Sequence, residues 1–213
     1  MTTCIIPLLA FTTVIATTDL RADDTAAEIL ERVRERYEEI EDAEILFSQK
    51  ITFSKTSLEQ KASGRLLLKK ENKYRLELND QTVVTDGVTV WSYSPDTDQV
   101  IIDVFKVDDR FLTPEKVLTG GPDDFSATVL EREKSGKAGL VVLKLAPRTD
   151  DSFITSLKLW VDEDSWLIRQ VEVLEFSGKK TAYIISDLNT NIGLPADTFS
   201  FIPPEGAEVV DLR

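Results

Sequence analysis

Residues 64–105 read GRLLLKKENKYRLELNDQTVVTDGVTVWSYSPDTDQVIIDVF and indicate the fold class more clearly than any other part of the chain. The stretch is rich in the β-branched and aromatic residues that favour strands. Asp86-Gly87 and Pro95-Asp96 interrupt it with residue pairs typical of tight turns. Short runs joined by such turns predict an antiparallel meander. No long helical pattern alternates with these runs, so a parallel α/β sheet is not expected.

The same signals continue on both sides of this stretch. In residues 43–53 apolar and polar residues alternate with a period of two, as in a strand with one buried face. The other strand candidates are 60–69, 73–79, 81–85, 88–94, 99–105, 125–133, 139–146, 153–161, 166–176 and 179–188. Since an all-β domain of this size commonly stays undivided, we expect one mainly β domain over residues 23–213, with few helices and about 10–11 strands.

One amphipathic helix is expected at the start of this domain. Thr25 and Glu28 have the spacing of a capping box, which marks a helix N-terminus. Apolar residues then recur at helical spacing, namely Ala26, Ile29, Leu30, Val33, Tyr37 and Ile40. The opposite face is charged, so the helix should lie on an apolar surface.

A short second helix is predicted after residue 112. Thr113 is a good N-cap residue, Pro114 suits the first helical position, and Gly120-Gly121 end the pattern. Its apolar residues, with those just before it, are Phe111, Leu112, Val117 and Leu118. They suit a lid across one end of a β-barrel, and they also suit a connector that completes the core. The residues alone leave both interpretations open.

The composition excludes several kinds of chemistry. The chain has no His, and its only Cys is Cys4. His-based acid/base catalysis, zinc sites with nitrogen and sulfur ligands, and an intrachain disulfide are therefore excluded. The net charge of −13 disfavours binding to the phosphate backbone of nucleic acids.

Carboxylates are the remaining source of chemistry. Asp162-Glu163-Asp164 is most simply a solvated hairpin turn, since a calcium site would need more oxygen ligands than this spacing guarantees. A glycosidase needs only two carboxylates at a suitable separation, but nothing in the sequence positions such a pair. We therefore expect no catalytic residues, no metal and no cofactor.

Residues 1–22 are expected to be a secretory signal peptide. Residues 5–16, IIPLLAFTTVIA, form an apolar run too short to span a bilayer, and Ala22 is a suitable small residue for a cleavage site. Cys4 precedes the apolar run, whereas a lipid-anchored Cys would follow it, so we interpret Cys4 as incidental. The expected mature chain is soluble, exported and free of Cys.

The chain resembles the outer-membrane lipoprotein carrier protein family (LolA). The shared residues in the central stretch are Gly64, Leu66, Lys69-Lys70, Tyr74, Thr85-Asp86-Gly87, Trp91, Tyr93, Pro95 and Gln99-Val100. Outside it they are Phe47-Ser48-Gln49-Lys50, Leu194-Pro195, Phe199-Ser200-Phe201, Pro203-Pro204 and Gly206. The resemblance therefore covers essentially the whole chain after residue 22, in order.

The resemblance implies a half-open antiparallel β-barrel around an apolar cavity that helices close. It also implies a non-enzymatic, monomeric periplasmic chaperone. Such a protein receives acylated lipoproteins from an inner-membrane ABC transporter and delivers them to an outer-membrane acceptor. Well-known members hold the lid closed with an Arg that is followed by Pro. Lys70, followed by Glu71, occupies that position here and is the candidate lid latch, although Lys lacks the planar donor fork of Arg.

Strand alternation and the resemblance together give the candidate cavity residues. They are Leu66, Leu68, Tyr74, Leu76, Leu78, Val83, Trp91 and Tyr93. Without the resemblance, ordinary core packing would account for all of them. Two other functions also stay open: a carrier of another lipid class on the same scaffold, and a protein-binding or sensor β-domain with a filled barrel.

Overall fold

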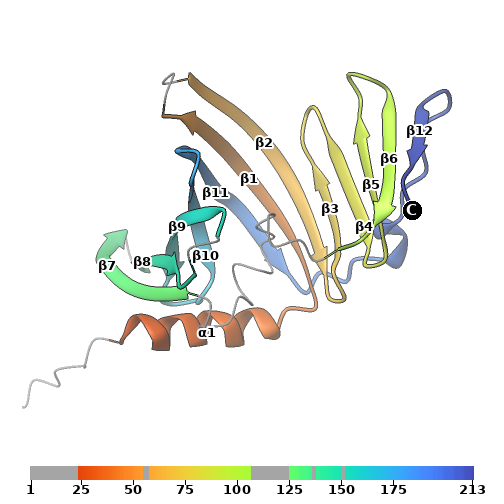
Figure 1. The fold of residues 1–213 in the computed structure, drawn as a ribbon. Helices are drawn as coiled ribbons and strands as arrows, with labels where there is room; N and C mark the ends of the chain where they lie inside the picture. Colours follow the sequence, from red (N-terminus) through yellow and green to blue (C-terminus); the bar gives the residue numbers. More distant parts are fainter. Residues whose placement is uncertain (1–23, 55–57, 107–124, 136–137, 150–151) are drawn as a thin grey trace, which may run out of the picture.

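A computed structural model describes residues 24–54, 58–106, 125–135, 138–149 and 152–213. Within these ranges the protein is one large curved sheet with a single α-helix, α1 (Ala26–Glu38) (Figure 1). The predicted signal peptide 1–22 and the predicted second helix after residue 112 lie outside the described residues. Among the described residues, no helix is both long and apolar enough to cross a membrane.

Helix α1 begins where the sequence predicted. The backbone N–H of Glu28 donates to Thr25 Oγ1 at 3.3 Å, and the backbone N–H of Thr25 donates to Glu28 Oε2 at 2.7 Å. The predicted capping box is therefore confirmed. Ile29 and Val33 are the buried residues of the helix, which confirms the predicted apolar face.

The sheet contains twelve strands. They are β1 (Asp42–Phe53), β2 (Leu58–Lys69), β3 (Lys73–Glu77), β4 (Thr82–Asp86), β5 (Thr89–Ser94), β6 (Gln99–Val104), β7 (Phe125–Ser135), β8 (Ala138–Pro147), β9 (Ile154–Asp162), β10 (Ile168–Glu175), β11 (Lys179–Thr190) and β12 (Glu208–Asp211). The eleven strands predicted from the sequence are confirmed as β1–β11. The predicted number was one too low, because β12 was missed.

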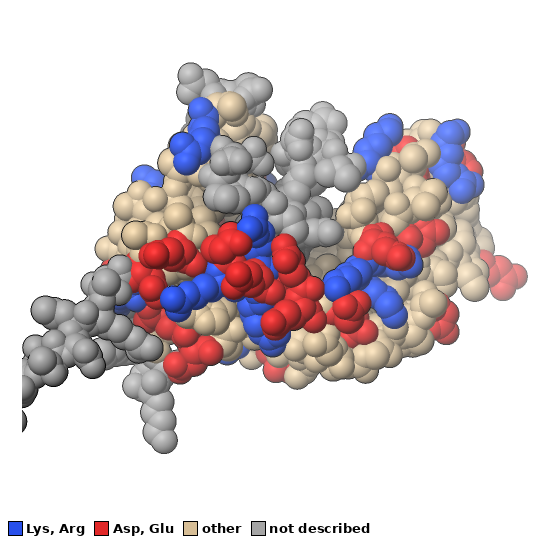
Figure 2. Space-filling model, turned by 90° about the horizontal axis from the view of Figure 1, so that it is seen from below, with Lys and Arg blue, Asp and Glu red and all other residues tan. Residues whose placement is uncertain are grey.

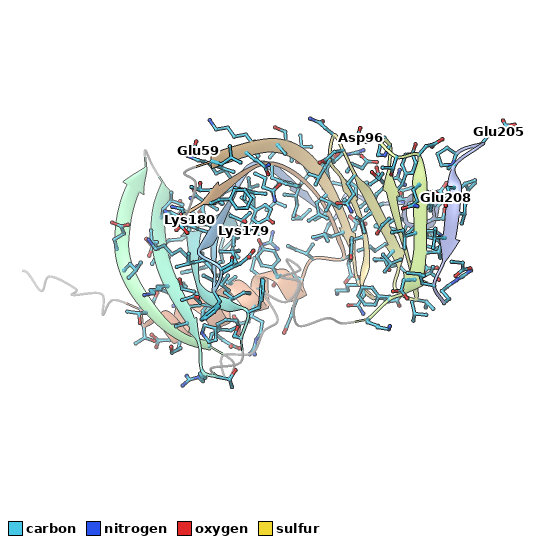
Figure 3. All side chains as sticks on the ribbon, turned by 45° about the horizontal axis from the view of Figure 1, so that its top comes forward. Glu59, Asp96, Lys179, Lys180, Glu205 and Glu208 are labelled. Carbon is cyan, nitrogen blue, oxygen red and sulfur yellow. The ribbon has the colours of Figure 1, made fainter. Side chains whose placement is uncertain are left out.

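The strand order is β12-β6-β5-β4-β3-β2-β1-β11-β10-β9-β8-β7. All neighbours pair antiparallel except β12 and β6, which pair parallel. The order begins at β12 and ends at β7, so the described sheet is open and these are its two edge strands. The sheet bends into an arch, and α1 crosses its opening (Figure 3). We call the face that packs on α1 the concave face and the other the convex face.

The principal core lies between α1 and the concave face of β7–β10. Its buried residues are Ile29, Val33, Val141, Leu143, Leu145, Ile154, Leu157, Leu159, Val161, Ile168 and Val173. The α1 residues contribute aliphatic side chains to a sheet surface made almost entirely of Val, Leu and Ile. Burial of this apolar area is the main source of stability in the fold.

The chain leaves β11 through an anchored crossing. Asp42 is 4% exposed, and its carboxylate accepts the backbone N–H groups of Ile192 at 2.7 Å, Gly193 at 3.1 Å and Leu194 at 2.8 Å. These charge-assisted bonds satisfy a buried carboxylate. The 3₁₀ helix η1 (Ala196–Phe199) then lies against β3 and β4.

The substitution Ile29→Ala tests the packing of α1. Ile29 is 0% exposed, so truncation should leave a cavity and lower the free energy of unfolding by about 2–5 kcal/mol. Glu35→Ala, on the exposed side of the same helix, should change it by no more than about 0.5 kcal/mol. Urea denaturation followed by circular dichroism measures both. Equal effects of the two substitutions would contradict the described core.

Candidate functional site

A second apolar cluster lies on the concave face beyond the part that α1 covers. Its buried residues are Ile45 and Phe47 of β1 and Leu66 of β2. Half-buried residues pack against them, namely Leu68, Tyr74, Leu76, Leu78, Tyr183, Ile185 and Leu188. We call these ten residues the concave patch. Tyr183 belongs to the edge of both clusters, so the patch continues the core without a break.

Strand register builds the patch. Residues directly opposite each other on neighbouring strands point to the same face. Ile45 lies opposite Leu66 on β2 and opposite Leu188 on β11, and Leu66 lies opposite Leu76 on β3. One row of apolar side chains therefore crosses four neighbouring strands on the concave face.

The structure divides the predicted cavity residues between two faces. Leu66, Leu68, Tyr74, Leu76 and Leu78 lie in the concave patch. Val83 lies opposite Leu76 in the register and so shares their face. These six predicted residues are brought together.

Trp91 and Tyr93 are not brought to the same place. Trp91 lies opposite Val84, which is one residue from Val83 and therefore points to the convex face. The Tyr93 ring lies 5.9 Å from the Phe201 ring, in the segment that follows η1. This C-terminal segment thus packs on the convex face of β3–β6, and Trp91 and Tyr93 belong to that layer.

Five members of the patch were not among the predicted site residues: Ile45, Phe47, Tyr183, Ile185 and Leu188. The alternation over residues 43–53 already set Ile45 and Phe47 on one face. Their membership follows only from the pairing of β1 with β11, which joins residues about 140 positions apart, as in the pair Phe47 and Ile185. No local pattern contains that pairing.

Gly64 opens space in the middle of the patch. A Cβ atom at this position would lie 2.5 Å from Phe47 Cζ and 2.7 Å from Leu78 Cδ2. The Phe47 ring therefore lies over the glycine backbone and would have to move if a side chain were present. The ring also contacts Tyr183 edge-on, with centroids 5.9 Å apart and an interplanar angle of 64°.

The patch is electrostatically neutral. Burial raises the pKa of the Tyr74 phenol, so this side chain is uncharged at neutral pH. No three His, Cys, Asp or Glu side chains among the described residues gather where a metal ion could be held. Such a surface can take up an apolar ligand.

The acidic turn at residue 162 has a structural role. Asp162 accepts the backbone N–H groups of Asp164 at 3.0 Å and Ser165 at 3.1 Å, and it accepts a hydrogen bond from Arg169 at 2.9 Å. Burial opposes ionisation of Asp162, but these hydrogen bonds outweigh it, and the pKa of the carboxyl is lowered. The predicted hairpin turn is present, but Asp162 is only 7% exposed, so the prediction that the turn is solvated is wrong for this residue.

Charged side chains gather outside the patch. Seen from the side of α1, acidic and basic residues crowd over the helix surface (Figure 2).

Lys70, the predicted lid latch, is exposed, and its Nζ lies 2.5 Å from Oε1 of Glu41. Glu41 lies between the end of α1 and the start of β1. The lid residues that Lys70 was predicted to hold, Phe111, Leu112, Val117 and Leu118, lie outside the described residues.

The substitution Gly64→Val tests the placement of the Phe47 ring. The added side chain must displace Phe47 and Leu78, so we expect the free energy of unfolding to fall by about 1–3 kcal/mol. Ser63→Val, on the convex face of the same strand, should be neutral or slightly stabilising because Val favours strands. Urea denaturation of both variants measures the difference, and an unchanged Gly64→Val protein would refute the close contact.

Comparisons with known proteins agree with this architecture. The sequence model of the family described as "Outer membrane lipoprotein carrier protein LolA" matches residues 38–202. The outer-membrane lipoprotein carrier protein of Pseudomonas paraeruginosa is 28% identical over 193 residues, covering 89% of each chain. That of Pseudomonas fluorescens is 27% identical over 211 residues, covering 97% of this chain and 96% of the relative.

Solved structures share the fold at lower identity. A conserved protein from Thermus thermophilus has a TM-score of 0.57 at 13% identity, over 86% of this chain and 97% of that chain. A structure of MucB has a TM-score of 0.52 at 17% identity, over 87% of this chain and 65% of that chain. Because the family match spans most of the chain, this protein belongs to the outer-membrane lipoprotein carrier protein family, LolA.

Proposed function

We propose that this protein carries acylated lipoproteins through the periplasm and binds their acyl chains on the concave patch. The observation that supports this most directly is the division of one apolar face. Over β7–β10 it packs on α1 as a core, whereas over β11-β1-β2-β3 seven of its ten residues are only half-buried. Half-buried apolar side chains on a concave surface are a suitable place for a ligand of the same chemistry.

The energetics favour partial burial of the cargo. A palmitoyl-sized chain of about fourteen methylenes gains roughly 11 kcal/mol on leaving water, at ~0.8 kcal/mol per methylene. Three such chains, fully buried, would together exceed the ~21 kcal/mol at which non-covalent affinities saturate. A carrier that must also release its load needs less than this. The half-buried patch residues meet that requirement.

The remaining parts of the proposal concern location and partners. Residues 1–22 would direct export, and the protein would take cargo from an inner-membrane ABC transporter and deliver it to an outer-membrane acceptor. The relatives are named as outer-membrane lipoprotein carrier proteins, which supports this route. The proposal assigns no catalytic group to the protein.

Native mass spectrometry of residues 23–213 with a purified triacylated lipoprotein tests the proposed function. We expect a one-to-one complex with the acylated form and none with the same lipoprotein lacking its acyl chains. Binding of both forms would mean that the polypeptide is recognised instead. Binding of neither would remove lipoproteins as cargo.

A pair of substitutions tests the location of binding. Leu76→Glu places a carboxylate in the concave patch, where an acyl chain could not solvate it, and should weaken binding of the triacylated lipoprotein at least about tenfold. Ile184→Glu adds the same charge on the convex face, where the native side chain is 48% exposed, and should leave the affinity unchanged. Circular dichroism confirms folding of both variants. Equal loss of affinity in the two would place the site elsewhere.

A further inference from the structure

A hydrogen-bonded polar pair lies on the concave face next to the concave patch. Gln49 of β1 lies directly opposite Tyr183 of β11, and its Nε2 donates a hydrogen bond to the Tyr183 hydroxyl at 3.2 Å. The edge-on contact with Phe47 fixes the Tyr183 ring, so the hydroxyl is held in place over the sheet. Both side chains are half-buried and point to the same face as the concave patch.

The pair lies where the apolar rows of the concave face meet a more polar end of the sheet. Toward the start of β1 the next row contains Phe47 and Ile185. Toward its end the rows become polar, since Ile51 lies between Gln60 and Thr181. The single hydrogen bond uses one N–H of the Gln49 amide. Among the described residues neither side chain makes a further hydrogen bond, so the second amide N–H and the Tyr183 O–H are available as donors.

The spacing along β1 matches the length of one acyl chain. Ala43, the last apolar position at the start of the strand, lies six positions before Gln49, and this stretch spans about 20 Å. An extended chain of sixteen carbons is also about 19 Å long, from ordinary C–C bond lengths. Toward the end of β1, Phe53 lies only four positions after Gln49, and its partner on β11 is the charged residue Lys179.

The charged residues at that end set the direction of the ligand. Lys179 and Lys180 begin β11, and Glu59 lies near the start of β2, at the same end of the arch (Figure 3). By strand alternation Lys50, Glu59 and Lys180 point to the convex face. Lys179 lies opposite Phe53 and points to the concave face, and its Nζ lies 2.8 Å from Glu175 Oε1. The Lys179–Glu175 pair forms a charged rim that suits the polar part of an acylated molecule, and the apolar rows from Phe47 to Ala43 suit its hydrocarbon.

We propose that Gln49 and Tyr183 form a carbonyl-binding subsite. The Gln49 amide N–H and the Tyr183 O–H donate to the ester or amide carbonyl at the head of a bound acyl chain. The chain then runs along β1 and β2 toward Ala43 and Leu68, and the polar remainder leaves over the rim at Phe53. The inference rests on the proposed function and adds to it the orientation of the cargo and a preference for acyl over alkyl chains.

The test compares two ligands that differ by one carbonyl, 1-palmitoylglycerol and its ether analogue 1-hexadecylglycerol. The affinity of each ligand is measured by its displacement of a fluorescent fatty-acid probe bound to residues 23–213. Each ligand is used below its critical micelle concentration. We expect the ester to bind about tenfold more tightly, the size of effect that one or two net hydrogen bonds give. Gln49→Leu and Tyr183→Phe together should reduce ester affinity to that of the ether and leave ether binding unchanged.

A matched control is available on the convex face. Gln170 of β10 lies opposite Ile184 and points away from the patch, so Gln170→Leu should keep the full preference for the ester. Equal affinity of the native protein for the two ligands would overturn the subsite while leaving the carrier function intact. The subsite would also be overturned if the double variant lost affinity for the ester and for the ether to the same extent. If the native protein bound neither ligand, the location of binding on the concave patch would itself be refuted, and the subsite with it.

Discussion

The pairing of β1 with β2 on one side and with β11 on the other is the constraint on which the rest of the structure depends. β1 pairs along its whole length with β2 and almost its whole length with β11, and it joins the two halves of the sheet. Because side chains alternate between faces, a slip of one residue would turn Ile45 and Phe47 from the concave to the convex face. The register of this one strand therefore sets which side chains form the patch, and it brings Gln49 and Tyr183 into contact.

The concave face is packed differently along its length. Over β7–β10 the aliphatic side chains of α1 fill it, and residues such as Leu143 and Leu159 are completely buried. Over β11-β1-β2-β3 the same face carries aromatic and aliphatic side chains that remain half-buried. The first part contributes most of the stability that the second part lacks, since half-buried apolar groups contribute less than buried ones. A binding surface can be left incompletely packed only where another part of the sheet holds the fold together.

The elements of this fold could be predicted from the sequence because their signals are local. The capping box at Thr25 and the turn at Asp86-Gly87 are set by residues within a few positions of each other. The position of Trp91 and Tyr93 on the convex face could not be predicted from such local signals. Their relation to Leu66 depends on the successive registers of β2, β3, β4 and β5, and on a C-terminal segment more than 100 residues away that covers the convex face. Strand β12 was missed because its four residues pair only at a sheet edge and carry no alternating burial.

The candidate site shows the same division between local and distant information. The six predicted residues that share the concave face lie on the hairpins β2–β3 and β3–β4, where one local alternation sets them all. Tyr183 comes from the far end of the sequence, yet it contributes a ring to the core, an edge contact to Phe47 and a hydroxyl to Gln49. A residue with three such contacts links the stable half of the sheet to the half that the ligand would occupy. Orientation of a bound chain can therefore be set by the same side chain that joins the two clusters, without a separate recognition element.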